Sequence, residues 1–182
     1  MSSKMKNSFT LIELVIVMAI VGILSVVGVY SYNSIMKNAR DAKRKNDLKE
    51  IQVALENYKV AHGTYPRNDP AESGGAANAI CGWDVSEKGN FINVLLTEGF
   101  LKQQPKDPSP QDEDFCAPPE KWGYRYYRYR DVDVGISDCG RYHYIIAAHM
   151  ENDGNANVDQ VPQCYVQKVG LVSSYFGIGG FE

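Results

Sequence analysis

The stretch NSFTLIELVIVMAIVGILSVVGVYSYNSIM, residues 7–36, decides how this chain folds, because Glu13 is the one formal charge that it carries. A helix needs about 20 mostly apolar residues to cross the ~30 Å hydrocarbon layer of a membrane, and this stretch is long enough. A cleaved secretory signal has a shorter apolar core of about 7–15 residues, followed by a small-x-small cleavage site. The sequence therefore predicts a membrane-spanning helix over residues 9–30.

Glu13 is a costly residue in such a segment. A carboxylate near the centre of a membrane helix costs about 2.5–3.5 kcal/mol on insertion scales. It therefore needs a partner, or a position near the interface from which the side chain reaches water. Physics alone leaves two interpretations open: a plain anchor that tolerates Glu13, and a helix in which Glu13 has a task.

Ser8-Phe9-Thr10-Leu11-Ile12-Glu13, with Lys4 and Lys6 before it and the apolar block after it, resembles the processing motif of type IV pilins and type II secretion pseudopilins. The resemblance implies a leader of residues 1–8, cleavage by the prepilin peptidase between Ser8 and Phe9, and N-methylation of the new Phe9 amine. Ser8 departs from the family, which usually has Gly there. Because Ser is also small, we expect it to slow or alter processing at most.

The resemblance also implies a role for Glu13 in assembly. The positive amine of Phe9 can pair with Glu13 of a neighbouring subunit in a filament core, where little water screens the attraction. Buried ion pairs are weak sources of net stability, so the pair is expected to set register rather than tightness.

The predicted function is a structural subunit, not an enzyme, of a homo-oligomeric filament like a type IV pilus. The alternatives are a pseudopilin that drives protein export in a type II secretion system, and an adhesin or DNA-uptake pilin. Expected partners are the prepilin peptidase and N-methyltransferase, a pilus or secretion assembly platform, and membrane lipid before assembly. No phosphate loop, nucleophile elbow or HExxH motif predicts catalysis.

Apolar residues beyond the span recur at spacings of three and four, with charged residues between them, which predicts an amphipathic continuation of the helix. These residues are Ile35, Ala39, Ala42, Leu48, Ile51, Leu55 and Tyr58. The first proline is Pro66, and Gly63 offers a stop. One helix over residues 9–61 is therefore expected.

Charge is divided along the chain. Residues 1–59 hold 9 Lys and Arg against 5 Asp and Glu, net +4, and residues 60–182 hold 10 against 17, net −7. The basic cluster is Lys37, Arg40, Lys43, Arg44 and Lys45. A solvated helix face explains it most simply; lipid head groups before assembly, or an acidic neighbour in a filament, are the alternatives.

The positions of Lys and Arg around the span conflict with the resemblance over orientation. The C-terminal flank has five such residues against two in the leader, which favours a cytoplasmic flank. The resemblance implies the opposite, and the positive-inside rule weakens for long translocated domains. We expect a single-pass membrane protein with its head outside the cytoplasm, in an extracellular or periplasmic filament after assembly.

Cysteine usage agrees with a head in an oxidising compartment. The four cysteines all follow the span and form no CxxC pair: Cys81, Cys116, Cys139 and Cys164. They predict two disulfides, with the connectivity left open. Zinc is the weaker alternative, because the three histidines show no ligand spacing relative to the cysteines.

Residues 62–182 are expected to form one globular head, so that the fold class is α+β: a long N-terminal helix packed on a small antiparallel sheet. Apolar residues between Phe91 and Leu101 predict a short helix that stops at Gly99. Stretches rich in Tyr, Val and Ile predict strands at Trp122–Arg130, Arg141–His149 and Cys164–Tyr175. Gly74-Gly75 and Gly179-Gly180 are predicted in loops.

This layout resembles that of pilin-like subunits. Gly63-Thr64-Tyr65-Pro66 after the long helix, and Asp107-Pro108 after the short one, are similar to what major pseudopilins and short pilins show.

Tyr124–Arg130 interleaves aromatic residues with arginines. Such a pattern can stack on bases and neutralise phosphates. It is also typical of a half-buried strand whose broken alternation at Tyr126-Tyr127 marks a bulge or an edge. The acidic head would repel nucleic acid, so we favour the strand and do not expect nucleic acid as a partner.

Asp153, Asn155, Asn157 and Asp159 place oxygen-bearing side chains at every second position around Gly154. Calcium takes 6–8 oxygen ligands at about 2.3–2.6 Å in such loops, although the rest of an EF-hand is missing. Pseudopilins hold calcium in a loop near the end of the sheet, so the resemblance supports a calcium site. A polar turn is the alternative.

Overall fold

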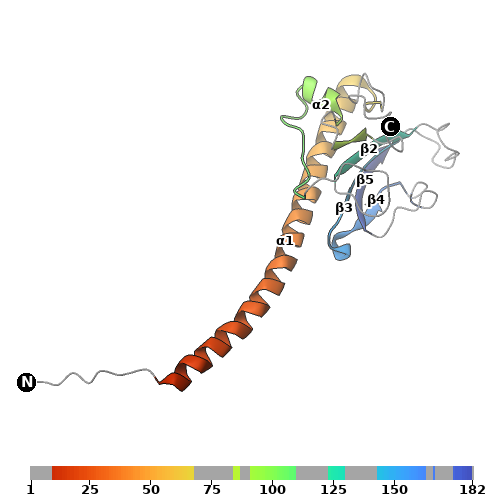
Figure 1. Cartoon of the computed structure of the whole chain (residues 1–182). Helices are drawn as coiled ribbons and strands as arrows, with labels where there is room; N and C mark the ends of the chain where they lie inside the picture. Colours follow the sequence, from red (N-terminus) through yellow and green to blue (C-terminus); the bar gives the residue numbers. More distant parts are fainter. Residues whose placement is uncertain are drawn as a thin grey trace, which may run out of the picture. The chain divides into compact units, whose positions relative to one another are not determined.

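The structure, a computed structural model, describes residues 10–67, 84–86, 91–109, 123–129, 143–162, 166 and 174–181. The chain divides into two compact units: unit 1, Met1–Lys37, and unit 2, Asn38–Glu182. The elements in chain order are α1 (Leu11–His62), β1 (Asp84–Val85), α2 (Asn93–Thr97), β2 (Tyr124–Tyr129), β3 (His143–His149), the 3-10 helix η4 (Asp153–Asn155), β4 (Asn157–Gln160) and β5 (Tyr175–Phe181) (Figure 1).

Helix α1 confirms the predicted long helix within the described residues. Its last residue is His62, next to the predicted end. Gly63 follows with φ of 78°, a left-handed conformation that suits glycine. The Gly63 N–H donates to the carbonyl oxygen of Lys59 at 2.7 Å, which satisfies one of the last carbonyls of the helix.

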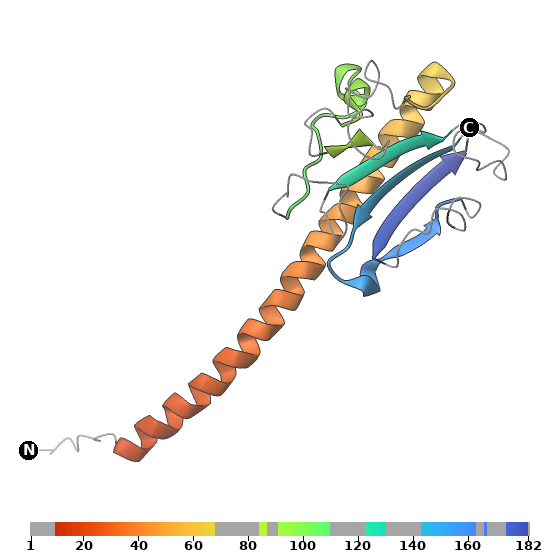
Figure 2. The same ribbon diagram turned by 45° about the vertical axis from the view of Figure 1, so that its right-hand side comes forward.

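Unit 2 contains a five-stranded sheet in the order β1-β2-β3-β5-β4. The first three pairs of neighbours are antiparallel, as predicted, whereas β4 and β5 are parallel, so the sheet is mixed. Parallel neighbours need a crossover of a dozen or more residues, and residues 161–174 supply that length. Figure 2 shows the strands side by side next to the C-terminal half of α1.

The strands predicted at 122–130 and 141–149 are confirmed as β2 and β3. The third predicted strand, Cys164–Tyr175, falls mostly outside the described residues. Strand β5 instead covers Gly179-Gly180, so the loop predicted at those glycines is wrong; Gly74-Gly75 lies outside the described residues. A Cβ on Gly179 would lie 2.6 Å from Pro162 Cδ, so glycine here permits close approach within a strand.

Strand β2 has no bulge, contrary to expectation. Its register with β3 runs without a shift from Tyr124 to Tyr129. Tyr126 is buried in the main core, whereas Tyr129 is buried with Ile145 and Val161 in a second cluster. The alternation is broken because both faces of the strand bury tyrosine, and not because the strand bends.

The main core lies between α1, α2 and the sheet. The predicted apolar stripe of α1 is confirmed from Leu48 onward, since Leu48, Ile51 and Leu55 are fully buried. Burial of each such side chain contributes about 1.5–3 kcal/mol. The first three members of the stripe, Ile35, Ala39 and Ala42, are exposed. The short helix α2 adds Leu95 to the core, and Gly99 follows it with φ of 80°, as its predicted role as a stop requires.

Candidate functional site

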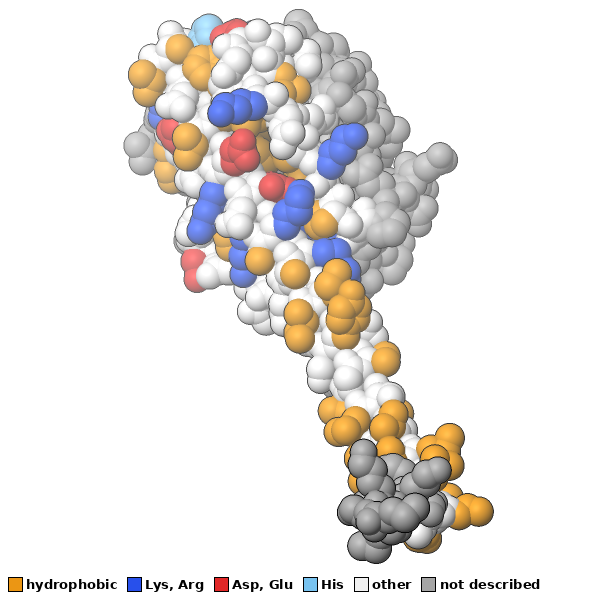
Figure 3. Space-filling view, turned by 90° about the vertical axis from the view of Figure 1, so that its left-hand side faces the viewer, with side chains coloured by type: hydrophobic (Ala, Val, Ile, Leu, Met, Phe, Trp, Pro, Cys, Tyr) orange, Lys and Arg blue, Asp and Glu red, His pale blue; other side chains and the backbone are white. Residues whose placement is uncertain are grey.

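The described part of unit 1 presents an apolar surface. Every large apolar side chain from Leu11 to Val29 is more than half exposed. Figure 3 shows hydrophobic side chains along this part of the helix. By length and composition α1 can cross a membrane, and none of its apolar window is buried, unlike the core helix of a soluble protein. A surface of this kind needs lipid or another protein to cover it.

Glu13 closes a capping box at the start of α1. Its Oε2 accepts hydrogen bonds from the Thr10 N–H at 2.8 Å and from the Thr10 hydroxyl at 2.6 Å. The Glu13 N–H in turn points at Thr10 Oγ1, at a long 3.4 Å. Thr followed three residues later by Glu is the sequence signature of this motif, and the sequence prediction missed it.

The structure does not describe the residues predicted for processing and for disulfides. Ser8 and Phe9 fall outside the described residues, and so do the four cysteines, Cys81, Cys116, Cys139 and Cys164. Cleavage after Ser8 and the formation of two disulfides therefore stay predictions.

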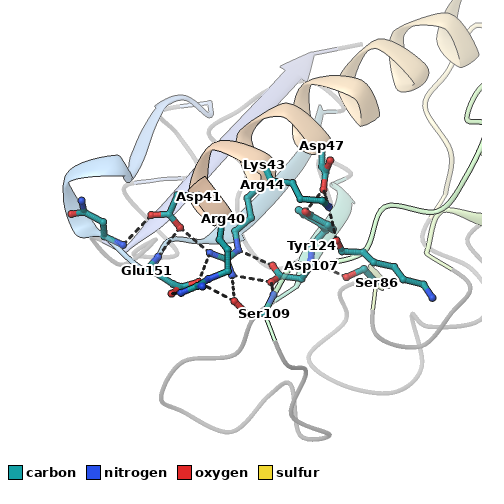
Figure 4. A network of polar contacts seen from close by, with 12 residues as sticks. Arg40, Asp41, Lys43, Arg44, Asp47, Ser86, Asp107, Ser109, Tyr124 and Glu151 are labelled. Atoms are coloured by element: carbon teal, nitrogen blue, oxygen red, sulfur yellow. Dashed lines mark hydrogen bonds and ion pairs between the residues drawn. The ribbon is translucent and has the colours of Figure 1, made fainter. Parts of the chain in front are cut away.

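In unit 2 a buried arginine joins α1 to two loops (Figure 4). The side chain of Arg44 is fully buried, and its guanidinium makes two hydrogen bonds of 2.8 Å to the Asp107 carboxylate. It also donates to Asp41 at 2.8 Å, to Ser109 at 2.6 Å and to Glu151 at 3.2 Å. Burial by itself lowers the pKa of Arg44, but the bonds to Asp107, Asp41 and Glu151 outweigh it and leave the pKa raised.

Glu151 accepts hydrogen bonds from a second arginine, Arg40, in addition to Arg44. Arg40 Nε donates to Glu151 Oε1 at 2.6 Å, and the Ser109 hydroxyl donates to the same oxygen at 2.9 Å. The hydrogen bond from Arg40 is the main cause that lowers the pKa of Glu151 to about 2, with Ser109 and Arg44 adding to it against the opposing effect of burial. Charge-assisted bonds of this kind are the strong ones.

The loop after β3 is held on α1 by further polar contacts. Asp41 accepts the N–H groups of Glu151 at 2.9 Å and of Asn152 at 3.0 Å. Asn38 Oδ1 accepts the side-chain amides of Asn152 at 2.9 Å and Asn155 at 3.1 Å. We call the set Asn38, Arg40, Asp41, Arg44, Asp107, Ser109, Glu151, Asn152 and Asn155 the helix clasp.

The clasp corrects the interpretation of the basic cluster. Arg44 is not on a solvated face, and Arg40 binds Glu151, more than a hundred positions away. Asp41 lies three positions before Arg44 on the same helix, but Asp107 and Glu151 come from distant loops, which a charge pattern along one helix does not reveal. Asp107 belongs to the Asp107-Pro108 pair noted in the sequence, so the structure gives that motif a partner in Arg44.

The residues predicted to bind calcium lie on η4 and β4. Asn155 turns its amide nitrogen to Asp41 at 3.0 Å, and Asn157 Oδ1 accepts the Asp159 N–H at 2.7 Å. The exposed carboxylates of Asp153 and Asp159 remain as oxygen ligands. Among the described residues no three His, Cys, Asp or Glu are grouped so that they could hold a metal ion, so a site here needs the asparagine oxygens; calcium stays a prediction.

Two kinds of relatives emerge from comparison with known proteins. The family model "Prokaryotic N-terminal methylation motif" matches residues 3–29. The chain is 32% identical over 103 residues to the type IV major pilin protein PilE1 of Neisseria gonorrhoeae, covering 56% of this chain and 45% of that pilin. It therefore spans less than half of that relative's length.

Two further relatives are proteins of type II secretion. The chain is 29% identical over 127 residues to the type II secretion system core protein G of Pseudomonas aeruginosa, covering 70% of this chain and 84% of that protein. With the core protein G of Vibrio cholerae it is 28% identical over 116 residues, covering 64% of this chain and 74% of that protein. No solved structure gives a significant match. The methylation motif and these relatives support the superfamily of type IV pilins and type II secretion pseudopilins, to whose members this chain is similar.

Proposed function

We propose that this chain is the subunit of a type IV pilus-like filament, anchored by α1 before assembly and polymerised through that helix. The observation that carries the proposal is the exposed apolar surface from Leu11 to Val29 with Glu13 as its one charge. In a filament, the apolar faces of other copies replace lipid around this surface. Glu13 then accepts the Phe9 amine of a neighbour.

The processing steps are inferred from the N-terminal methylation motif. The prepilin peptidase cuts between Ser8 and Phe9 and methylates the Phe9 amine, and an assembly platform in the membrane extracts the subunit from lipid. The head, residues 62–182, lies outside the cytoplasm, where Cys81, Cys116, Cys139 and Cys164 form two disulfides. Loop residues Asp153, Asn155, Asn157 and Asp159 bind calcium as an accessory ion. The methylation motif over residues 3–29 supports the processing step.

A pseudopilin of a type II secretion system is the second candidate. The match to the core protein G of P. aeruginosa covers more of both chains than the match to the gonococcal pilin does, which favours this alternative. Deletion of the gene separates the two candidates. Loss of exported proteins from the medium supports the pseudopilin, and loss of long surface filaments with normal export supports the pilus subunit.

The filament proposal is tested by Glu13→Ala in the native host. The variant is expected in the membrane fraction at the wild-type level but absent from filaments sheared off the cells, because the amine of the neighbour loses its partner. Glu50→Ala is the matched control, since Glu50 is an exposed carboxylate on the same helix. Filament yield from Glu13→Ala equal to that of Glu50→Ala would overturn the proposal.

A further inference from the structure

In the capping box, the two carboxylate oxygens of Glu13 have different hydrogen-bond partners. Oε2 receives both the Thr10 N–H and the Thr10 hydroxyl, at 2.8 and 2.6 Å. No hydrogen bond within the described residues involves Oε1. The carboxylate is thus held from one side, by a residue one turn before it, and the other oxygen is left to accept a further donor.

The surroundings make this arrangement more important than an ordinary helix cap. The segment that follows is apolar and exposed, so lipid or other copies of the chain surround it. In such surroundings water is scarce, and a carboxylate that lacks hydrogen bonds is far more costly than one on a wet surface. The two bonds from Thr10 keep one side of the carboxylate satisfied while the subunit resides in the membrane.

We propose that Thr10 is a positioning residue for assembly: its hydroxyl and amide hold Oε2 of Glu13 and so present Oε1 to the cationic amine of the next copy. This inference rests on the proposed pairing of Glu13 with a neighbour's amine. The hydroxyl is the part of Thr10 that mutation can remove. The backbone amide remains in any variant, so loss of the hydroxyl weakens the hold on Glu13 without removing the charge.

A purely structural role for Thr10 leads to different expectations. The rest of α1 keeps its own backbone ladder, so loss of one capping hydroxyl leaves the helix and its insertion intact. A structural cap would therefore have little effect on assembly, whereas a positioning residue lowers assembly at unchanged insertion. Ser25 offers a matched control, because its hydroxyl also bonds within this segment, to the Val21 carbonyl oxygen at 2.7 Å, and touches no charge.

The test compares Thr10→Val, Thr10→Ser and Ser25→Ala as full chains in the native host. Intact mass gives the state of the N-terminus, and shearing gives the filament yield. Thr10→Val is expected to be processed and inserted, with a filament yield roughly tenfold lower, the factor that loss of one hydrogen bond to a charged group produces. Thr10→Ser restores the yield because it restores the hydroxyl, and Ser25→Ala assembles normally.

A second readout does not depend on filaments. Dicyclohexylcarbodiimide modifies neutral carboxyl groups in membranes, and Thr10→Val is expected to react at Glu13 several-fold faster than wild type, because the ionised form has lost a hydrogen bond. Thr10→Ser is expected to react at the wild-type rate. Equal rates for all three proteins would overturn the inference.

The outcomes separate this inference from the function on which it rests. If Glu13→Ala abolishes filaments while Thr10→Val assembles normally, the inference fails and the proposed function stands. If Thr10→Val keeps its leader, the loss of filaments comes from processing, and the inference fails. If wild-type protein forms no filament, both fail. Adding Thr10→Val to Glu13→Ala is expected to change nothing further, since the two residues act as one unit.

Discussion

The guanidinium of Arg44 on α1 makes two 2.8 Å hydrogen bonds to the carboxylate of Asp107, which lies 63 positions further along the chain. Both side chains are fully shielded from solvent. Two parallel bonds fix the direction of approach as well as the distance, which an ammonium group cannot do. This pair therefore specifies where the segment after α2 meets the long helix.

Replacing Arg44 should destabilise unit 2 strongly. Arg44→Ala leaves Asp41, Asp107 and Glu151 close together without their central cation, and removal of one partner of a buried ion pair costs about 3–5 kcal/mol. Thermal unfolding of the full chain in detergent measures the loss. Lys49→Ala is the control, because Lys49 is exposed on the same helix, and should shift the midpoint little. Similar midpoints for both variants would contradict a central role for Arg44.

Acid should loosen the helix clasp through Glu151. The Arg40 hydrogen bond is the main cause that lowers its pKa from 4.5 to about 2, so the folded state prefers the ionised form. The resulting stability is present above pH 4.5 and is lost as the pH falls toward 2. Unfolding midpoints measured between pH 6 and pH 2 should fall more steeply for wild type than for Glu151→Gln. Parallel curves would assign the acid sensitivity to other groups.

The sequence predicts local elements better than it predicts their partners. Helix α1 follows from a continuous apolar period that ends at Gly63, and β2 and β3 follow from runs of aromatic and β-branched residues. Strand β5 was missed because Gly177, Gly179 and Gly180 have the composition of a loop. What selects glycine there is the approach of Tyr144 on β3 and of Pro162 just after β4, and that contact exists only in the folded chain.

In the candidate site, too, the sequence predicts local features better than distant partners. Glu13 stands out in the sequence because a charge in an apolar helix is rare, and its capping box with Thr10 was readable from the spacing. The helix clasp was not, because two of the three carboxylates that bind Arg44, those of Asp107 and Glu151, lie on segments far along the chain. A basic cluster looks the same in sequence whether its side chains meet water or buried acids.

Gly179→Ala should destabilise unit 2. The added Cβ would lie 2.6 Å from Pro162 Cδ and 2.8 Å from the Tyr144 carbonyl oxygen, and the backbone oxygen cannot move aside cheaply. Overpacking of this kind costs about 1–3 kcal/mol. Gly154→Ala is the control, because its Cβ would meet the side chain of Asn152 alone, with Oδ1 at 3.3 Å and Cγ at 4.0 Å. Denaturant midpoints compare the two variants, and an unchanged midpoint for Gly179→Ala would count against the close packing of β5.

Calcium should stabilise the chain if the loop of η4 and β4 binds it. A ligand that binds the folded state alone adds about 2.7 kcal/mol at a hundredfold excess over its dissociation constant. Chelator-treated protein should therefore melt at a higher temperature on addition of calcium. The response should be lost in Asp153→Asn with Asp159→Asn and kept in Glu50→Gln. No response in wild type would leave the loop a polar turn.

Two exposed valines on the unit 2 part of α1 should matter for assembly and not for folding. Val53 is 60% exposed and Val60 is 88% exposed. Seven residues apart, they lie on one face of the helix, where a solvated surface usually carries charges. If a neighbouring copy covers this face, aspartate at both positions places two charges in an apolar contact, and the filament yield should fall at an unchanged melting temperature. Val53→Thr with Val60→Thr is the matched control, since it keeps the branched shape of both side chains and adds no charge. Equal filament yields from the two double variants would mean that solvent, and not another copy, covers this face.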